Sequence, residues 1–327
     1  MTIREQLEQH ELQFLSPLAC KSTDKGAVIR LKQETPCPYR TAFQRDRDRI
    51  LHCQAFRRLK HKTQVFLSPI GDHYRTRLTH TLEVSQVART IARALFLNED
   101  LTEAIALGHD MGHSPFGHAG EAVLNRICPH GYKHYEQSVR VADKIETLNL
   151  TYAVRDGILC HTNRIAATRE GNVVRFADRI AYINHDIEDA FRAGVLHPED
   201  LPEHPVQVLG KTKSERITTL VAAVVEHGAE EIGMDKTIQT AFDELHDFMY
   251  ANVYLNPDAK QEEKKAELLL ETLYQYFRKN PGKMPEQYQD IAADSDIDRA
   301  VCDYISGMSD SYAVNLYSEL FIPKFWK

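Results

Sequence analysis

Apolar residues recur at steps of three and four positions along much of this chain, which is the spacing of an amphipathic helix. The pattern is clearest over residues 77–96, whose apolar positions include Leu82, Val84, Val87, Ala88, Ile91, Ala94 and Leu95. A second long stretch covers residues 173–193, and Gly194 directly after it can end a helix in left-handed backbone. We therefore predict two long helices over 77–96 and 173–193.

The rest of the chain also favours helices. Asp100 and Glu103 have the spacing of a capping box, which predicts a helix from about Asp100 to Gly108, and another is expected to begin near Ala119. Helical patterns also cover the segment 43–66 and the stretches 213–231, 236–250, 259–279 and 295–319. Alternation at 65–74 indicates a small hairpin at most. With no repeat and no flexible linker, the pattern predicts an all-α helical bundle in a single domain over 1–327.

Composition narrows the class of protein. The 327 residues are 43% hydrophobic and 27% charged, with 15 Gly and 13 Pro, which is typical of a soluble globular chain and excludes collagen-like and low-complexity sequences. No run approaches the roughly 18 to 20 apolar residues of a membrane span. The amino terminus lacks the apolar run of a signal peptide. We therefore expect a cytoplasmic protein without a membrane segment.

Charge and cysteine content argue against two kinds of site. The 40 Lys and Arg against 47 Asp and Glu give a net charge of -7, which does not indicate a globally basic surface for nucleic acid. Six cysteines form no CxxC pair and stand at positions 20, 37, 53, 128, 160 and 302. Scattered thiols predict reduced cysteines and argue against a zinc site built from thiolates.

The residues that most strongly indicate chemistry are His80, the adjacent pair His109 and Asp110, and Asp178. Each lies on a predicted helix or at its end, so a common core could bring them together. Two imidazoles and two carboxylates suit a Mn, Fe, Mg, Ni or Zn ion that keeps open positions for water and substrate. From spacing alone, unrelated capping or core residues remain the alternative.

A His, a His-Asp pair and a later Asp in an all-helical chain resemble the signature of the HD-domain metal phosphohydrolases. The flanking segments narrow the resemblance to the deoxynucleoside triphosphate triphosphohydrolases, the dGTPase-like family. The matching segments are FRRLKHKTQVF at 56–66, RLTHTLEV at 77–84, ALGHDMGHSPFGHAGE at 106–121, YKHYEQS at 132–138, FADRIAYINHDIEDA at 176–190 and CDYISGMSDSYA at 302–313. The block GHDMGHSPFGHAGE is far more specific than the shared H, HD, D pattern.

The resemblance implies a metal-binding core over about 56–195 and a carboxy-terminal helical region over about 211–327. It assigns the ligands of a divalent metal ion as His80, His109, Asp110 and Asp178. His118 and Glu121 match the family's catalytic histidine and its acidic partner, and their spacing puts them on one helix face, where Glu121 could fix the tautomer of His118. The resemblance implies that His118 transfers a proton near the scissile phosphate, as acid or as base.

Substrate contacts follow from the same resemblance, since a triphosphate requires cations and donors. The residues that match phosphate-binding positions are Arg77, His113, His134 and Arg179, the last where a related protein has a lysine. The residues that match positions around the deoxyribose, where they would disfavour a 2′ hydroxyl, are Gln64, Tyr182 and Asp186. Ordinary polar or solvated roles are the alternative for each. By helical geometry alone, His185 points nearer to Asp178 than Asp186 does.

The resemblance therefore implies a metal-dependent hydrolase that converts a deoxynucleoside triphosphate, dGTP or others, into a deoxynucleoside and inorganic triphosphate. Three alternatives remain. The first is another HD phosphohydrolase that acts on a nucleoside monophosphate, a cyclic nucleotide or guanosine tetraphosphate. The others are a module that binds a nucleotide or single-stranded nucleic acid without hydrolysis, and a di-metal oxygenase.

Further partners are implied less directly. Relatives form symmetric oligomers, some with effector sites, so the resemblance implies a homo-oligomer and admits an activating nucleotide. The basic runs in 45–62 are interpreted either as a solvated helix face or as a patch for nucleotide or single-stranded nucleic acid. Ser311 stands where the family more often carries Arg, which puts in doubt any substrate or subunit contact made by that block.

Overall fold

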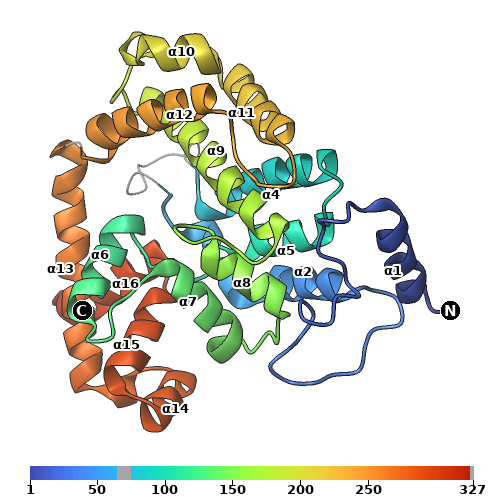
Figure 1. Cartoon of the computed structure of the whole chain (residues 1–327). Helices are drawn as coiled ribbons and strands as arrows, with labels where there is room; N and C mark the ends of the chain where they lie inside the picture. Colours follow the sequence, from blue (N-terminus) through green and yellow to red (C-terminus); the bar gives the residue numbers. More distant parts are fainter. Residues whose placement is uncertain (65–74, 256, 325–327) are drawn as a thin grey trace.

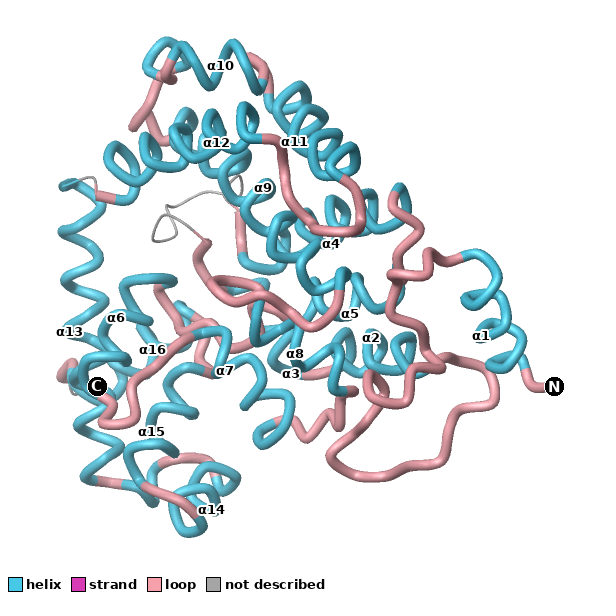
Figure 2. The backbone as a smooth tube through the Cα atoms, in the orientation of Figure 1, coloured by secondary structure: helices cyan, strands magenta, loops and turns pink. Residues whose placement is uncertain are grey.

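The protein is all-helical, as predicted. The computed structural model describes residues 1–64, 75–255 and 257–324, and these contain sixteen α-helices joined by loops and short 3₁₀ or π turns (Figure 2). Extended pairing within these residues is limited to two isolated bridges, Arg30 with Thr151 and Thr63 with Thr76. The hairpin predicted at 65–74 lies outside the described residues.

The helices follow one another along the chain without a long interruption. Their bounds are α1 Ile3–Phe14, α2 Ala42–His52, α3 Gln54–Arg58, α4 Arg77–Ala94, α5 Glu99–Gly108, α6 Gly117–Ile127, α7 His134–Arg140, α8 Tyr152–Cys160, α9 Arg169–Arg192, α10 Glu203–Leu209, α11 Lys213–His227, α12 Lys236–Met249, α13 Pro257–Lys279, α14 Glu286–Asp294, α15 Ile297–Ser306 and α16 Asp310–Phe321.

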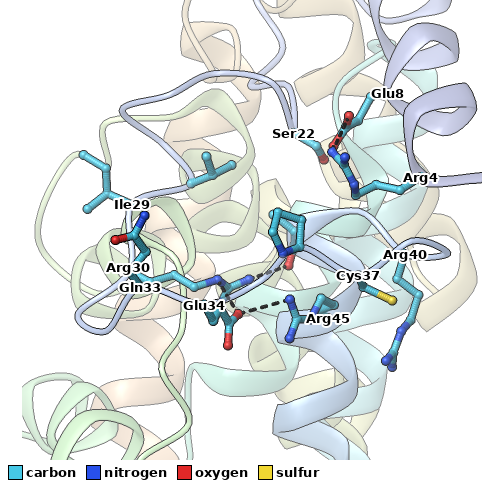
Figure 3. Close-up of a pocket in the computed structure, with 13 residues that line it drawn as sticks. Arg4, Glu8, Ser22, Ile29, Arg30, Gln33, Glu34, Cys37, Arg40 and Arg45 are labelled. Carbon is cyan, nitrogen blue, oxygen red and sulfur yellow. Dashed lines mark hydrogen bonds and ion pairs between the residues drawn. The ribbon is translucent and has the colours of Figure 1, made fainter. Parts of the chain in front are cut away.

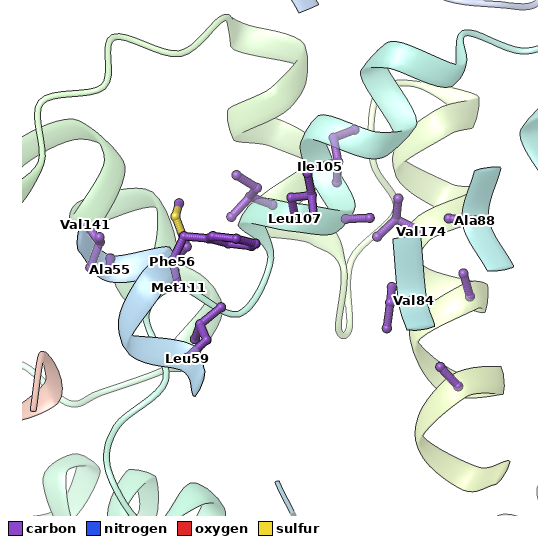
Figure 4. Packing of buried hydrophobic residues seen from close by; sticks show 14 of the residues in the cluster. Ala55, Phe56, Leu59, Val84, Ala88, Ile105, Leu107, Met111, Val141 and Val174 are labelled. Carbon is purple, nitrogen blue, oxygen red and sulfur yellow. The ribbon is translucent and has the colours of Figure 1, made fainter. Parts of the chain in front are cut away.

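Helices α4, α5 and α9 form the centre of the fold, where each packs against the other two. Of the apolar positions predicted for 77–96, Val84, Val87, Ala88 and Ile91 are buried, whereas Leu82 and Ala94 are exposed. Val84 and Ala88 of α4 lie beside Val174 of α9 (Figure 4). Burying a side chain of Val or Leu size stabilises a fold by about 1.5–3 kcal/mol. This packing fixes, relative to each other, the two long helices that carry His80 and Asp178.

The carboxy-terminal helices α13 to α16 pack against α6 and against one another. Figure 1 shows α13 along one edge of the molecule, between the end of α12 and the group α14 to α16. Helix α13 packs against α6, α15 and α16. The helices within residues 257–321 are thereby held against α6, which follows the HDMGHSPF loop. All six cysteines are free thiols, as predicted.

One predicted helix cap is wrong, although the helix starts within one residue of the predicted position. Helix α5 begins at Glu99, and the cap is Asn98, whose side-chain oxygen accepts from the Leu101 amide at 3.1 Å. Asp100 instead accepts hydrogen bonds from Gln44 and Arg47 of α2, at 2.9 and 3.0 Å. The Asp100 side chain, which the capping-box spacing predicted to cap the helix, therefore binds a neighbouring helix instead.

Two predicted helices are each divided. The segment 43–66 breaks at Cys53, and the stretch 295–319 breaks between α15 and α16, where Ser309 caps α16 by accepting from the Tyr312 amide. Five shorter helices, α1, α7, α8, α10 and α14, were not predicted, because segments of 7 to 12 residues show too little periodicity. Gly194 has φ 68 after α9, as predicted.

Candidate functional site

The four predicted metal ligands meet at the centre of the molecule. His80 Nε2 lies 3.2 Å from Asp178 Oδ1 and 3.8 Å from Asp110 Oδ2. His109 Nε2 lies 3.5 Å from Asp110 Oδ1 and 3.9 Å from Asp178 Oδ1. Ligands about 2.1 Å from one ion stand roughly 3 to 4.2 Å apart, so all four separations fit a shared ion.

Hydrogen bonds orient both imidazoles toward this point. His109 Nδ1 lies 2.6 Å from the carbonyl oxygen of Ala106 and donates to it, which leaves the Nε2 lone pair directed at the carboxylates. That Nε2 atom is buried and has no hydrogen-bond partner. His80 Nδ1 lies 2.9 Å from His185 Nε2. A buried acceptor without a donor is costly, and a cation at this point would satisfy it.

The two carboxyl groups are held as carboxylates. Burial opposes ionisation of Asp178, but the hydrogen bond from His80 and the charge of nearby histidines lower its pKa to about 2. Burial likewise opposes ionisation of Asp110, and His109, His113 and Arg77 hold its pKa well below the usual value. Two carboxylates and the two imidazole Nε2 atoms that face them are the donor set that a divalent cation requires.

A cavity of about 610 Å³ opens above this group of ligands. Arg77 lies in its wall, on the first turn of α4, and its Nη1 donates to Asp110 Oδ2 at 2.8 Å. Arg77 is only 2% exposed, and its Nε and Nη2 atoms have no partner. A buried guanidinium with two unused donor nitrogens indicates a binding site for an anion such as phosphate.

Three further predicted histidines line the same cavity. His113 and His134 are stacked with ring centroids 4.2 Å apart, and His113 Nε2 lies 3.6 Å from Asp110 Oδ1. His118, on the first turn of α6, has an 81% exposed side chain in the open cavity. Glu121 accepts from His134 Nδ1 at 2.9 Å, whereas its distance to His118 Nδ1 is 3.9 Å. Glu121 thus contacts both imidazoles and orients His134 more directly, and the pairing of Glu121 with His118 stays a prediction.

The residues predicted to surround a sugar also line this cavity. Tyr182 and Asp186 stand one turn apart on α9, and both line the cavity together with Gln64. Tyr254, in the π-helical turn Tyr250–Tyr254 after α12, donates its hydroxyl to Asp186 Oδ2. Gln64 Oε1 is buried without a hydrogen-bond partner. These residues offer an aromatic ring, a carboxylate and an unused amide oxygen to a ligand.

Of the seven residues predicted to bind substrate, Arg179 is the one that does not line the cavity. Its Nη2 donates to Asp243 Oδ1 at 3.0 Å, and its guanidinium lies 5.0 Å from the ring centroid of Phe242, both on α12. Arg179 follows Asp178 directly, and successive helical residues point about 100° apart. The side chain therefore reaches the neighbouring helix instead of the ligand cluster.

Sequence reasoning missed one histidine of this site. His161 is 2% exposed, lines the cavity and, with His109 and Asp110, forms a group that could hold a metal ion. It follows α8, a short helix without a recognised pattern, so only proximity in the fold reveals it. His185, which helical geometry directed toward Asp178, lies against His80 and supports it.

A second, smaller cavity of about 390 Å³ lies among amino-terminal residues, away from the histidines (Figure 3). It is lined by several arginines, but these are engaged with carboxylates. Arg30 and Arg45 both contact Glu34, at 2.9 and 3.3 Å, and Arg4 contacts Glu8 at 2.7 Å. None of the predicted site residues lies in this cavity, so the larger one is the candidate site.

Two sequence families match the chain, the HD domain over residues 77–183 and the phosphohydrolase-associated domain over residues 232–319. Among curated relatives, a deoxyguanosinetriphosphate triphosphohydrolase-like protein of Caldanaerobacter subterraneus subsp. tengcongensis is 53% identical, covering 100% of this chain and 98% of that protein. A protein of the same name from Clostridium perfringens is 52% identical, covering 99% of each.

Solved structures share the fold at low identity. A hypothetical protein from Aquifex aeolicus gives a TM-score of 0.51 at 20% identity, over 85% of this chain and 68% of that one. A phosphohydrolase from Bacteroides thetaiotaomicron gives 0.53 at 16% identity, over 83% and 68%. Within the described residues, no helix has the length and apolar character needed to cross a membrane.

Proposed function

Because the chain belongs to the deoxyguanosinetriphosphate triphosphohydrolase-like proteins and carries the HD domain of phosphohydrolases, we propose that it hydrolyses deoxynucleoside triphosphates to a deoxynucleoside and inorganic triphosphate. The observation that carries this proposal is one cavity lined by His80, Asp110 and Asp178, which form the ligand cluster together with the buried His109, and by Arg77 with its unused donors. Two expectations from the sequence remain predictions: that the protein is cytoplasmic and that it forms a homo-oligomer.

His80, His109, Asp110 and Asp178 would hold a divalent ion, and Mn, Mg, Fe, Ni and Zn all suit this donor set. Such an ion, when bound, supplies a Lewis acid at a phosphate oxygen and lowers the pKa of water. The chain's own contribution is orientation, because Ala106 and His185 fix the two imidazoles. Fixed ligands of this kind raise metal affinity.

The phosphates would bind along the wall formed by Arg77, His113 and His134. Arg77 would use its free Nε and Nη2 atoms to donate to phosphate oxygens, while Nη1 stays on Asp110. The amino terminus of α6 also faces the cavity, since Phe116, His118 and Ala119 line it, and a helix amino terminus favours an anion. The hydrogen bond that His134 Nδ1 donates to Glu121 fixes the His134 ring where it stacks on His113.

His118 would transfer a proton in the reaction. In the proposed hydrolysis, water forms a bond to the α-phosphorus while the bond from that phosphorus to the 5′ oxygen breaks, and the 5′ oxygen gains a proton. His118, the exposed imidazole in the cavity wall, is suited either to accept the proton of water or to protonate the leaving oxygen.

The deoxyribose would lie against Tyr182, with Asp186 and Gln64 available for its 3′ hydroxyl. Asp186 accepts from the Tyr254 hydroxyl through Oδ2, and its Oδ1 lies 2.6 Å from His185 Nδ1, so the carboxylate has a fixed direction. A ring packed against the sugar leaves no partner for an added 2′ hydroxyl, which is the basis on which such a site discriminates against ribonucleotides.

Product analysis tests the proposal. Purified protein is incubated with Mn²⁺ or Mg²⁺ and the four deoxynucleoside triphosphates, singly and as a mixture that supplies any activating nucleotide. Ion-exchange chromatography should resolve deoxynucleoside and intact triphosphate as the only products. Release of pyrophosphate or monophosphate would instead indicate a different phosphohydrolase. Tight nucleotide binding without turnover, unchanged in His109→Ala, would favour a binding role.

A further inference from the structure

Asp310 connects two segments of the site although it lies almost two hundred residues further along the chain. It is the first residue of α16, and its two carboxylate oxygens accept hydrogen bonds on different sides. Oδ1 accepts from the Phe116 amide at 2.9 Å, and Oδ2 accepts from the amide of Thr63 at 2.8 Å and from the Thr63 hydroxyl. Asp310 is not among the site residues that the resemblance to the dGTPase-like family implies.

Phe116 is the residue at which the backbone turns into α6. It has φ 62 and ψ 28, and Gly117 follows with φ 55, so two consecutive residues are left-handed. A non-glycine residue in this region costs about 1–3 kcal/mol and persists only where surrounding contacts impose it. Helix α6 has no side-chain cap at this end. The hydrogen bond from Phe116 to Asp310 is therefore a contact that imposes the turn.

The turn is also packed closely against substrate-facing groups. A Cβ atom on Gly117 would lie 3.4 Å from Arg77 Nη2 and 3.6 Å from the carbonyl oxygen of Gln64. His118 is the next residue. A shift of the turn would thus change the position of His118 relative to Arg77 and Gln64 at once.

A second contact from the same carboxy-terminal turn supports the loop before Phe116. Lys62 is buried, and its Nζ donates to the carbonyl oxygens of His113 and of Ser306, the last residue of α15, at 2.5 and 2.8 Å. The segment 62–63 is thereby joined to the loop 113–116 and to the turn 306–310. In Figure 1, α16 lies next to α6, as these contacts require.

We propose that Asp310 is a positioning residue for the hydrolysis, which fixes the left-handed turn at Phe116 and Gly117 and so directs His118 into the cavity. Asp310 touches neither the substrate nor the metal site and acts through the backbone of Phe116. The expected change in kcat rests on the proposed function. The conformation of the turn does not, because hydrogen exchange measures it without turnover.

The test compares variants that affect α16 in different ways. Asp310→Ala removes both acceptors, and Asp310→Asn keeps only one, since an amide has a single acceptor oxygen. Ser309→Ala removes the cap of α16, which costs about 1 kcal/mol, and leaves Asp310 in place. Ser311→Ala changes an exposed neighbour. Ser309→Ala is therefore the control for a loss of stability that does not involve the turn.

Asp310→Ala should lower kcat by about 10- to 100-fold, since misplacing a reacting group by 1 Å can cost about 100-fold. KM should change by less than about threefold, the metal content per chain should stay the same, and Asp310→Asn should fall between Asp310→Ala and wild type. Hydrogen exchange in a peptide spanning 113–121 should become at least about tenfold faster in Asp310→Ala. Ser309→Ala and Ser311→Ala should match wild type in both kcat and exchange.

Either of two results would overturn the proposal: unchanged exchange at 113–121 in Asp310→Ala, or an equal loss of kcat in Asp310→Ala and Ser309→Ala. If wild type hydrolyses no deoxynucleoside triphosphate, the proposed function fails, and the exchange comparison alone then decides the role of Asp310.

Discussion

Gly112 lies two residues after the ligand Asp110, and we expect that an alanine there disrupts the site. A Cβ atom would lie 2.1 Å from the Ser138 amide nitrogen, 2.4 Å from the Gln137 carbonyl carbon and 2.6 Å from the His134 carbonyl oxygen. All three are backbone atoms of α7, so relief requires α7 to move by roughly 1 Å. Overpacking of this kind costs about 1–3 kcal/mol, and backbone clashes place Gly112→Ala at the upper end.

In a chain of this length, about 3 kcal/mol corresponds to a fall in Tm of roughly 4 °C. Because α7 begins at His134, its movement also displaces that ring from His113. Misplacement by 1 Å can cost about 100-fold in rate, so kcat should fall by roughly that factor. Thermal unfolding followed by circular dichroism measures the first effect, and product chromatography at saturating substrate measures the second.

Gly108→Ala is the matched control on the other side of the ligand pair. Its Cβ atom would meet only side-chain atoms, the nearest being Ile158 Cδ1 at 2.6 Å and Ile50 Cδ1 at 3.1 Å. Flexible methyl groups can move, so Gly108→Ala should lower Tm by less and keep kcat within a few-fold. Equal effects of Gly112→Ala and Gly108→Ala on kcat would refute the reasoning from backbone contact.

The remaining predictions concern the ligands, the sugar wall and one buried carboxyl group. Asp110→Ala should abolish turnover and lower bound metal measured by elemental analysis, whereas His118→Ala should abolish turnover with metal retained; equal metal loss would remove His118 from proton transfer. Tyr182→Ala should raise activity on ribonucleoside triphosphates relative to deoxy substrates, and an unchanged ratio would contradict the sugar contact. Burial raises the pKa of Glu170 from 4.5 to about 7. Between these pH values the folded state keeps a proton on Glu170 that the unfolded state loses. The free energy of unfolding therefore falls by about 3 kcal/mol as the pH rises over that range. Glu170→Gln should therefore have a higher Tm than wild type at pH 8 and nearly the same Tm at pH 4.5, and a constant difference across that range would contradict the assigned pKa.

The helices were predictable where an apolar face runs long enough for its three- and four-residue spacing to be recognised. The stretches 77–96 and 173–193 became α4 and α9 within a few residues, because their buried faces repeat over four turns or more. Asp100 failed as a cap because its carboxylate pairs with Arg47 from another helix. The spacing of residues within one segment gives no indication of a contact with another helix.

The site was predictable as a set of residues but not as a set of contacts. Motif positions named His134, Glu121 and His118, whereas only the fold shows that Glu121 reaches His134 across the loop between α6 and α7. Arg179 illustrates the opposite case, since a neighbour of a ligand in sequence points to α12 in space. Helical rotation of about 100° per residue separates adjacent side chains that a motif places together.

The charge of the cavity floor predicts that substrate binding depends on the metal. Without an ion, the floor carries the charges of Asp110 and Asp178, and Arg77 is already paired with Asp110. A divalent cation balances the two carboxylates and leaves the charge of Arg77 for the phosphates. Chelation should therefore weaken binding of a deoxynucleoside triphosphate by at least about tenfold, the factor given by 1.4 kcal/mol, because two close like charges repel it. A deoxynucleoside without phosphates is the control, and calorimetry should show its weak binding unchanged by chelation. Equal affinity of the triphosphate for the metal-free and metal-loaded protein would show that the phosphates do not lie over this floor.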